Sequence, residues 1–219
     1  MPFKIRRGLS WCRCAGRIVF LDLAADRYFC LSPCVQPAFE RMLAGDDRPD
    51  RAVQALIDQR VLVPAGSGSG DPRPAPRPAR GDLLAGSPLA APPAALVAAF
   101  AAHYKAMALL RCYRLADIVG RIEADRRRPG LHGEAAREKA RRIAAAFAIA
   151  GAWLRVDGRC LPRALALLSV CRRHGVRADL VFGVRLDPFT AHCWVQLGDE
   201  VLVGDYEQVR VYTPILAVR

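Results

Sequence analysis

Apolar residues recur with two different spacings in residues 1–65. Short apolar or alternating runs, each bounded by turn residues, predict strands at 10–14, 17–23, 27–31 and 61–63. Apolar residues at helical spacing predict helices at 32–44 and 49–59, and Ser32 followed by Pro33 suits the start of the first one. Strands that lead into helices in this way predict a small winged-helix-like module over residues 1–65.

Residues 66–79 interrupt both patterns. Gly and Ser alternate at 66–70, and Gly/Ser sequence can bury no apolar surface. Proline then recurs at about every second position of 71–78, which keeps the chain extended. We therefore expect a flexible Gly/Pro-rich linker at 66–79 and a second domain at 80–219.

The second domain begins with helices rich in Ala and Leu, predicted at 93–114, 115–126 and 133–154. A further helix is predicted at 160–174, where Gly175 ends it. Antiparallel strands follow at 178–184, 191–197 and 201–205. The expected fold class is therefore α+β.

Composition narrows the classes of partner. The chain has 219 residues, of which 53% are hydrophobic, and a formal net charge of +12. Its arginines are scattered along predicted helices without interleaved aromatic residues, so the charge favours a solvated surface or an acidic peptide over nucleic acid. The first residues are basic and lack the apolar run of a signal peptide, and the apolar helix at 94–110 is interrupted by His103 and Lys105, so we expect no membrane span. We expect a cytoplasmic protein whose eight cysteines are thiols.

Cys160 is the strongest candidate nucleophile. Leu161 and Pro162 follow it, and because proline is tolerated only in the first turn of a helix, Cys160 should lie at or beside a helix N-terminus. The unpaired N–H groups and the dipole of that terminus favour a thiolate and can hold an oxyanion. A buried, unreactive cysteine is the alternative that position alone leaves open.

His192 and Asp205 supply the other two groups of a Cys-His-Asp triad. If Gly198 and Asp199 form a two-residue turn, the strand register places Asp205 directly opposite His192, close enough to orient the imidazole. A slip of one residue would move Asp205 to the other face. A helix carrying Cys, packed on a sheet carrying His and Asp, is the arrangement of papain-like and transglutaminase-like cysteine peptidases. The contact of Cys160 with the other two residues rests on that analogy.

The other cysteines favour structural roles. Cys171 is predicted to pack, and so is Cys193, because alternation along a strand turns it to the face opposite His192. Four N-terminal cysteines offer a rival zinc site: Cys12, Cys14, Cys30 and Cys34. Their spacing matches no Cys-x-x-Cys knuckle, and small buried cysteines are common. We therefore expect no metal.

Two segments of the second domain resemble the maturation peptidases of lasso-peptide biosynthesis, the B proteins, a group of transglutaminase-like cysteine peptidases. The segments are Val156-Asp157-Gly158-Arg159-Cys160-Leu161-Pro162-Arg163 and Asp187-Pro188-Phe189-Thr190-Ala191-His192-Cys193-Trp194-Val195. The likeness spans about 136–219 and implies a triad of Cys160, His192 and Asp205. The chain departs from the family at Cys193, where Ala is usual, and at Gln196, where an acidic residue is common.

The segment 18–33 is similar to the precursor-peptide recognition element of ribosomal-peptide pathways. This resemblance implies that a leader peptide adds as a strand beside the third strand, in a groove against a helix. The leader-binding residues that it implies are Tyr28, Phe29, Cys30 and Leu31 at the edge, with Val53, Leu56 and Ile57 as groove walls. The alternative is that these apolar side chains simply form the core.

Together the two resemblances imply a leader peptidase of lasso-peptide biosynthesis in which recognition module and peptidase are fused. They also imply a partner cyclase that resembles asparagine synthetase and uses ATP. The chain carries no phosphate-binding Gly loop, so we expect no bound cofactor, and any ATP dependence would act through the cyclase. Two rivals remain: an acyl-transferring enzyme of the transglutaminase type, and a non-catalytic module that delivers the precursor to the cyclase.

Overall fold

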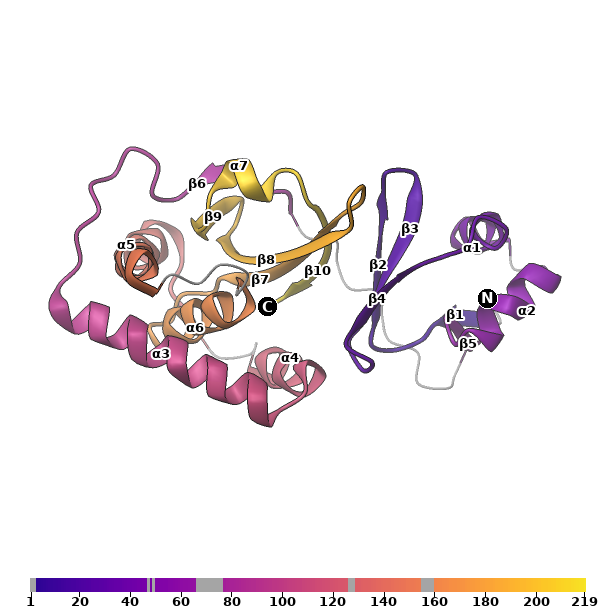
Figure 1. Cartoon of the computed structure of the whole chain (residues 1–219), viewed down its shortest axis with the longest axis horizontal. Helices are drawn as coiled ribbons and strands as arrows, with labels where there is room; N and C mark the ends of the chain where they lie inside the picture. Colours follow the sequence, from indigo (N-terminus) through magenta and orange to yellow (C-terminus); the bar gives the residue numbers. More distant parts are fainter. Residues whose placement is uncertain (1–2, 47, 49, 66–76, 126–128, 155–159) are drawn as a thin grey trace. The chain divides into compact units, whose positions relative to one another are not determined.

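The computed structural model describes residues 3–46, 48, 50–65, 77–125, 129–154 and 160–219. The chain divides into two compact units, Met1–Pro74 and Ala75–Arg219, and each is described by itself (Figure 1). Residues 66–76 of the expected linker lie outside the described residues.

Unit 1 contains two antiparallel sheets. The strands are β1 (Phe3–Ile5), β2 (Leu9–Cys14), β3 (Arg17–Asp22), β4 (Arg27–Cys30) and β5 (Leu62–Pro64). One sheet has the order β2-β3-β4, and β1 pairs with β5 in the other. Ala15 and Gly16 join β2 to β3 with φ angles of 46° and 75°, the left-handed values that a tight hairpin turn requires. The sequence predicted β2 to β5 but not β1.

Helix α1 (Gln36–Leu43) begins later than the predicted start at Ser32. Residues 33–35 form a turn, in which the Ser32 carbonyl accepts hydrogen bonds from the N–H groups of Val35 and Gln36. Ser32 therefore orders the entry to α1 through its backbone and is not the side-chain cap that the sequence suggested.

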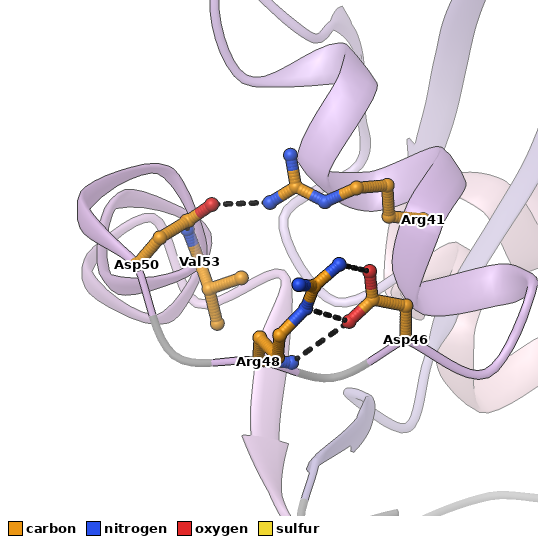
Figure 2. Close-up of polar contacts among 5 residues, drawn as sticks. All are labelled: Arg41, Asp46, Arg48, Asp50 and Val53. Atoms are coloured by element: carbon orange, nitrogen blue, oxygen red, sulfur yellow. Dashed lines mark hydrogen bonds and ion pairs between the residues drawn. The ribbon is translucent and has the colours of Figure 1, made fainter.

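Helix α2 (Arg51–Asp58) is capped by Asp50, whose side chain accepts a hydrogen bond of 2.7 Å from the Val53 N–H. The Asp50 carboxylate also pairs with Arg41 of α1, as Figure 2 shows, so one residue starts α2 and joins it to α1. In the connection between the helices, Arg48 pairs with Asp46.

Aromatic side chains fill the core of unit 1. Phe20 of β3 and Phe39 of α1 are fully buried, and their ring centroids lie 5.2 Å apart in an edge-to-face contact. Phe29 of β4 stacks on Phe20 at 5.2 Å, and Trp11 of β2 meets Phe39 at 5.4 Å. These contacts fix the three-stranded sheet against α1, because aromatic pairs add to the stabilisation that burial provides.

Unit 2 carries a five-stranded sheet and five helices among its described residues. In chain order its elements are β6 (Gly81–Asp82), α3 (Pro93–Cys112), α4 (Leu115–Ala124), α5 (Gly133–Leu154), α6 (Cys160–Arg173), β7 (Asp179–Arg185), β8 (Thr190–Leu197), β9 (Glu200–Val203), α7 (Tyr206–Val209) and β10 (Thr213–Val218). Helices α3 to α6 and strands β7 and β8 match the sequence prediction closely. The strand predicted at 201–205 ends at Val203, and β6, α7 and β10 have no counterpart in that prediction.

The sheet of unit 2 has the order β10-β7-β8-β9-β6, antiparallel except where β6 pairs with β9. Helix α6 packs against β7 and β8, and it contacts α3 and α5 (Figure 1). On the other face, Val209 of α7 packs with Val181, Trp194 and Val201. The central strands are therefore covered on both faces, and α6 is held directly against the strand that carries His192.

Helix α3 is the one helix among the described residues that is long and apolar enough, by length and composition, to cross a membrane. It packs against α5 and α6, and His103 is buried near its middle. These contacts cover only part of the helix, since 22% of its apolar stretch is buried.

Candidate active site

Cys160 is the first residue of α6, as the position of Pro162 predicted. It is half buried, and its sulfur accepts hydrogen bonds from two consecutive residues of β8. The thiol and the N–H of Cys193 are two of the donors, and the imidazole of His192 is the third. The packing of α6 on β8 thus brings together residues that are far apart in the sequence.

These contacts control the ionisation of Cys160. The hydrogen bond from the Cys193 thiol and then those from His192 and the Cys193 N–H lower the pKa of Cys160 from 9.0 to about 4, helped by the charge of His192. Burial of the thiol acts in the opposite direction but is outweighed. Cys160 is therefore a thiolate at neutral pH, which is the nucleophilic form of cysteine.

His192 is held among aromatic rings. Its centroid lies 5.2 Å from that of Tyr212, with an interplanar angle of 31°, and 6.3 Å from that of Trp194. Gly183 of β7 lies directly opposite His192 in the sheet. A Cβ at Gly183 would come within 2.7 Å of the Trp194 ring, so the glycine makes room for the rings that flank His192.

The predicted register between His192 and Asp205 is wrong. An irregularity between β8 and β9 shifts the pairing, so that Val203 lies opposite Val195 and not opposite Trp194. A bulge of this kind adds one residue to one strand and moves every later residue of that strand by one place. The geometric argument that placed Asp205 beside His192 therefore fails.

Asp205 instead begins α7. β9 ends at Val203, and the Asp205 carboxylate accepts a hydrogen bond of 2.9 Å from the Glu207 N–H. No hydrogen bond between Asp205 and His192 occurs among the described residues, and the Asp205 side chain is exposed. The structure thus brings Cys160 and His192 together and leaves Asp205 in a different local role.

Cys193 contacts the nucleophile, which sequence reasoning missed. Its assignment to the face opposite His192 led to the prediction of a packing role, yet its thiol is hydrogen-bonded to Cys160. That bond and burial raise the pKa of Cys193 well above 9.0, so it keeps its proton. Cys171, by contrast, is fully buried in α6, and burial alone raises its pKa to about 12. The sequence signal that could have separated these two cysteines is the position of Cys193, directly after His192 and at a site where the resembled family usually has Ala.

The residues implied to bind a leader lie on β4, just after it, and on α2. Three are buried in the core of unit 1: Leu31, Val53 and Leu56. Four are half buried: Tyr28, Phe29, Cys30 and Ile57. In the sheet order, β4 is an edge strand. The edge needed for strand addition is thus present, while the three core residues offer little surface to a ligand.

A cavity of about 320 Å³ lies at the start of this edge strand. Arg27 and Phe29 of β4 line it, together with Gln59 at the end of α2 and the ion pair of Arg6 with Asp22. Four of its eight lining residues are charged and three are apolar (Ala24, Ala25 and Phe29), a mixed lining that suits the side chain of a peptide laid along β4.

Three of the four N-terminal cysteines, Cys12, Cys14 and Cys30, lie near one another. Among the described residues, no three His, Cys, Asp or Glu side chains are grouped so as to hold a metal ion. Burial, and then the proximity of Cys14 and Cys30, raise the pKa of Cys12 to about 12. A neutral thiol in this position behaves as a small apolar side chain.

A comparison with protein families matches residues 104–217 to the model described as the transglutaminase-like superfamily. The matched region contains α6, β7, β8, β9 and all but the last residue of β10, and so all the groups that contact Cys160. No curated protein and no solved structure matches the chain significantly.

Proposed function

Because the chain belongs to the transglutaminase-like superfamily, we propose that it is a cysteine peptidase that removes the leader from a lasso-peptide precursor. One observation carries the catalytic part of this proposal: Cys160 at the start of α6 is hydrogen-bonded to His192 and ionised at neutral pH. The two segments that resemble lasso-peptide maturation peptidases contain these two residues, which supports the choice of substrate.

In the proposed reaction, the Cys160 thiolate attacks the carbonyl carbon at the leader–core junction. The protonated His192 gives its proton to the leaving amine, which becomes the amino terminus of the core. Water, deprotonated by His192, then attacks the thioester and releases the leader with a free carboxylate. The flanking rings of Trp194 and Tyr212 hold the imidazole for both steps.

We keep Asp205 as the third member of the triad on the resemblance alone. To orient His192, its carboxylate would have to accept a hydrogen bond from the imidazole, whereas in the structure its Oδ1 accepts one from the Glu207 N–H. If it does so in the complex with substrate, Asp205→Asn lowers kcat by a factor of 10² or more, in line with roughly 10⁴-fold for the corresponding change in a serine protease triad. A value of kcat close to that of the wild type leaves Cys160 and His192 as a catalytic pair.

Unit 1 is proposed to be the leader-recognition module, with a winged-helix-like arrangement. The exposed edge of β4 supports strand addition, and the cavity beside Phe29 supports a side-chain pocket. Fusion to the peptidase turns cleavage of a bound leader into an intramolecular event, which raises the effective concentration of the scissile bond.

The proposed partners are the leader segment of the precursor peptide and an asparagine-synthetase-like cyclase that closes the macrolactam with ATP. We propose no nucleic-acid, membrane or metal partner, and no cofactor in the chain itself. The proposed location is the cytoplasm, where the reduced thiol of Cys160 is maintained.

Mass spectrometry of a lasso-peptide precursor incubated with the protein, with and without cyclase and ATP, tests the proposal. We expect cleavage at a single bond by the wild type and by Cys171→Ala, which removes a buried thiol from the same helix, and none by Cys160→Ala. An amine-linked leader in place of the free acid would instead identify an acyltransferase. Full support of lasso-peptide formation by Cys160→Ala would identify a delivery module and refute catalysis.

A further inference from the structure

Cys193 makes hydrogen bonds that a residue with only a packing role would not need. It is 5% exposed, and it directly follows His192 in β8. Its thiol and its backbone N–H both form hydrogen bonds to Cys160. Two consecutive residues of one strand therefore contact the same sulfur atom.

The direction of the thiol hydrogen bond follows from the charge of Cys160. A thiolate has no proton, so it can only accept, and the S–H of Cys193 must be the donor. Of the two thiols in contact, Cys160 has the advantage as the ionised partner because it lies at the N-terminus of α6 and beside His192. Cys193, whose pKa is raised well above 9.0, retains the proton that the bond requires.

We propose that Cys193 is a catalytic residue, whose thiol donates the hydrogen bond that keeps Cys160 in the reactive thiolate form. An apolar side chain at this position would remove that donor and leave the imidazole and the backbone N–H to offset the burial of Cys160. The assignment concerns the ionisation of the sulfur. This role of Cys193 therefore goes beyond the proposed leader cleavage, because acyl transfer needs the same thiolate.

The pH dependence of alkylation tests this role without any peptide substrate. Iodoacetamide reacts with the thiolate, and mass spectrometry of the peptide containing Cys160 gives the rate at that residue alone. The full-length wild type is compared with Cys193→Ala, Cys193→Val and Cys193→Ser. Ala and Val lack a donor and bracket Cys in size, since Ala is smaller and Val is larger, whereas Ser keeps a hydroxyl donor. Cys171→Ala serves as the control for loss of a buried thiol.

We expect the apparent pKa of Cys160 to rise by about one to two pH units in the folded Ala and Val variants, because a hydrogen bond to a charged group is worth about ten- to hundredfold in the ionisation equilibrium. Cys193→Ser should lie nearer to the wild type, and Cys171→Ala should match it. Near-ultraviolet circular dichroism checks that each variant is folded. An unchanged profile in a folded Ala or Val variant, or an equal shift in Cys171→Ala, overturns the proposal. Because cleavage is not measured, this result is independent of whether the leader-peptidase function holds.

Discussion

Replacing Gly183 with alanine is the sharpest test of the packing around His192. A Cβ built at this position lies 2.7 Å and 2.8 Å from two ring atoms of Trp194 and 3.0 Å from the Cβ of Tyr212. The Trp194 ring is buried and donates a hydrogen bond of 2.9 Å to Gln196, so it has little freedom to move away. Overpacking of this kind typically costs about 1–3 kcal/mol.

Urea unfolding followed by tryptophan fluorescence measures this cost. Gly81→Ala is the matched control, because Gly81 is also in a strand of the same sheet but a Cβ there meets nothing within 4 Å. We expect Gly183→Ala to lose about 1–3 kcal/mol and the control to change by less than about 0.5 kcal/mol. Displacement of the rings should also lower the alkylation rate of Cys160, since His192 loses its position. Equal stability and equal reactivity of the two variants would refute the packing argument.

Three further predictions concern ionisation, capping and the core. Because the pKa of folded Cys160 is lowered from 9.0 to about 4, its alkylation should stay fast as the pH falls and should decline only near pH 4. By linkage, the thiolate stabilises the folded state fully above pH 9, and this stabilisation is lost as the pH falls through about 4. Asp50→Ala should lower the free energy of unfolding through loss of the α2 cap. Arg48→Ala, which breaks an exposed ion pair, should lower it by less. Equal losses in denaturant titrations would contradict the capping assignment. Phe20→Ala should cost about 3–5 kcal/mol because Phe20 is fully buried between Phe29 and Phe39, and a loss below about 1 kcal/mol would show that unit 1 has a different core.

Local features of the sequence determined where many elements begin and end. Pro162 identified Cys160 as the start of a helix because proline fits only the first turn, and the structure begins α6 at Cys160. Ala15-Gly16 identified the hairpin turn, whose left-handed backbone glycine adopts without strain. These predictions depend on residues adjacent in the chain, and for that reason they needed no knowledge of the fold.

Elements without a local signal were not predicted. β6 has only two residues, Gly81–Asp82, which is too short for any alternation to show, and it is a strand only because it pairs with β9. β10 contains Pro214 and a register irregularity, both of which interrupt a strand pattern. Their pairing partners supply the hydrogen bonds that define them.

The tertiary structure alone decided which side chains meet the nucleophile. From the sequence, Cys193 and His192 could be assigned to opposite faces of β8. The sequence did not show where α6 crosses that strand, and the crossing in the structure brings Cys160 into contact with both residues. The hairpin register likewise depended on a bulge that removed Asp205 from the position opposite His192. Periodicity specifies a face of one element, whereas contact between elements is set by the packing of the whole domain.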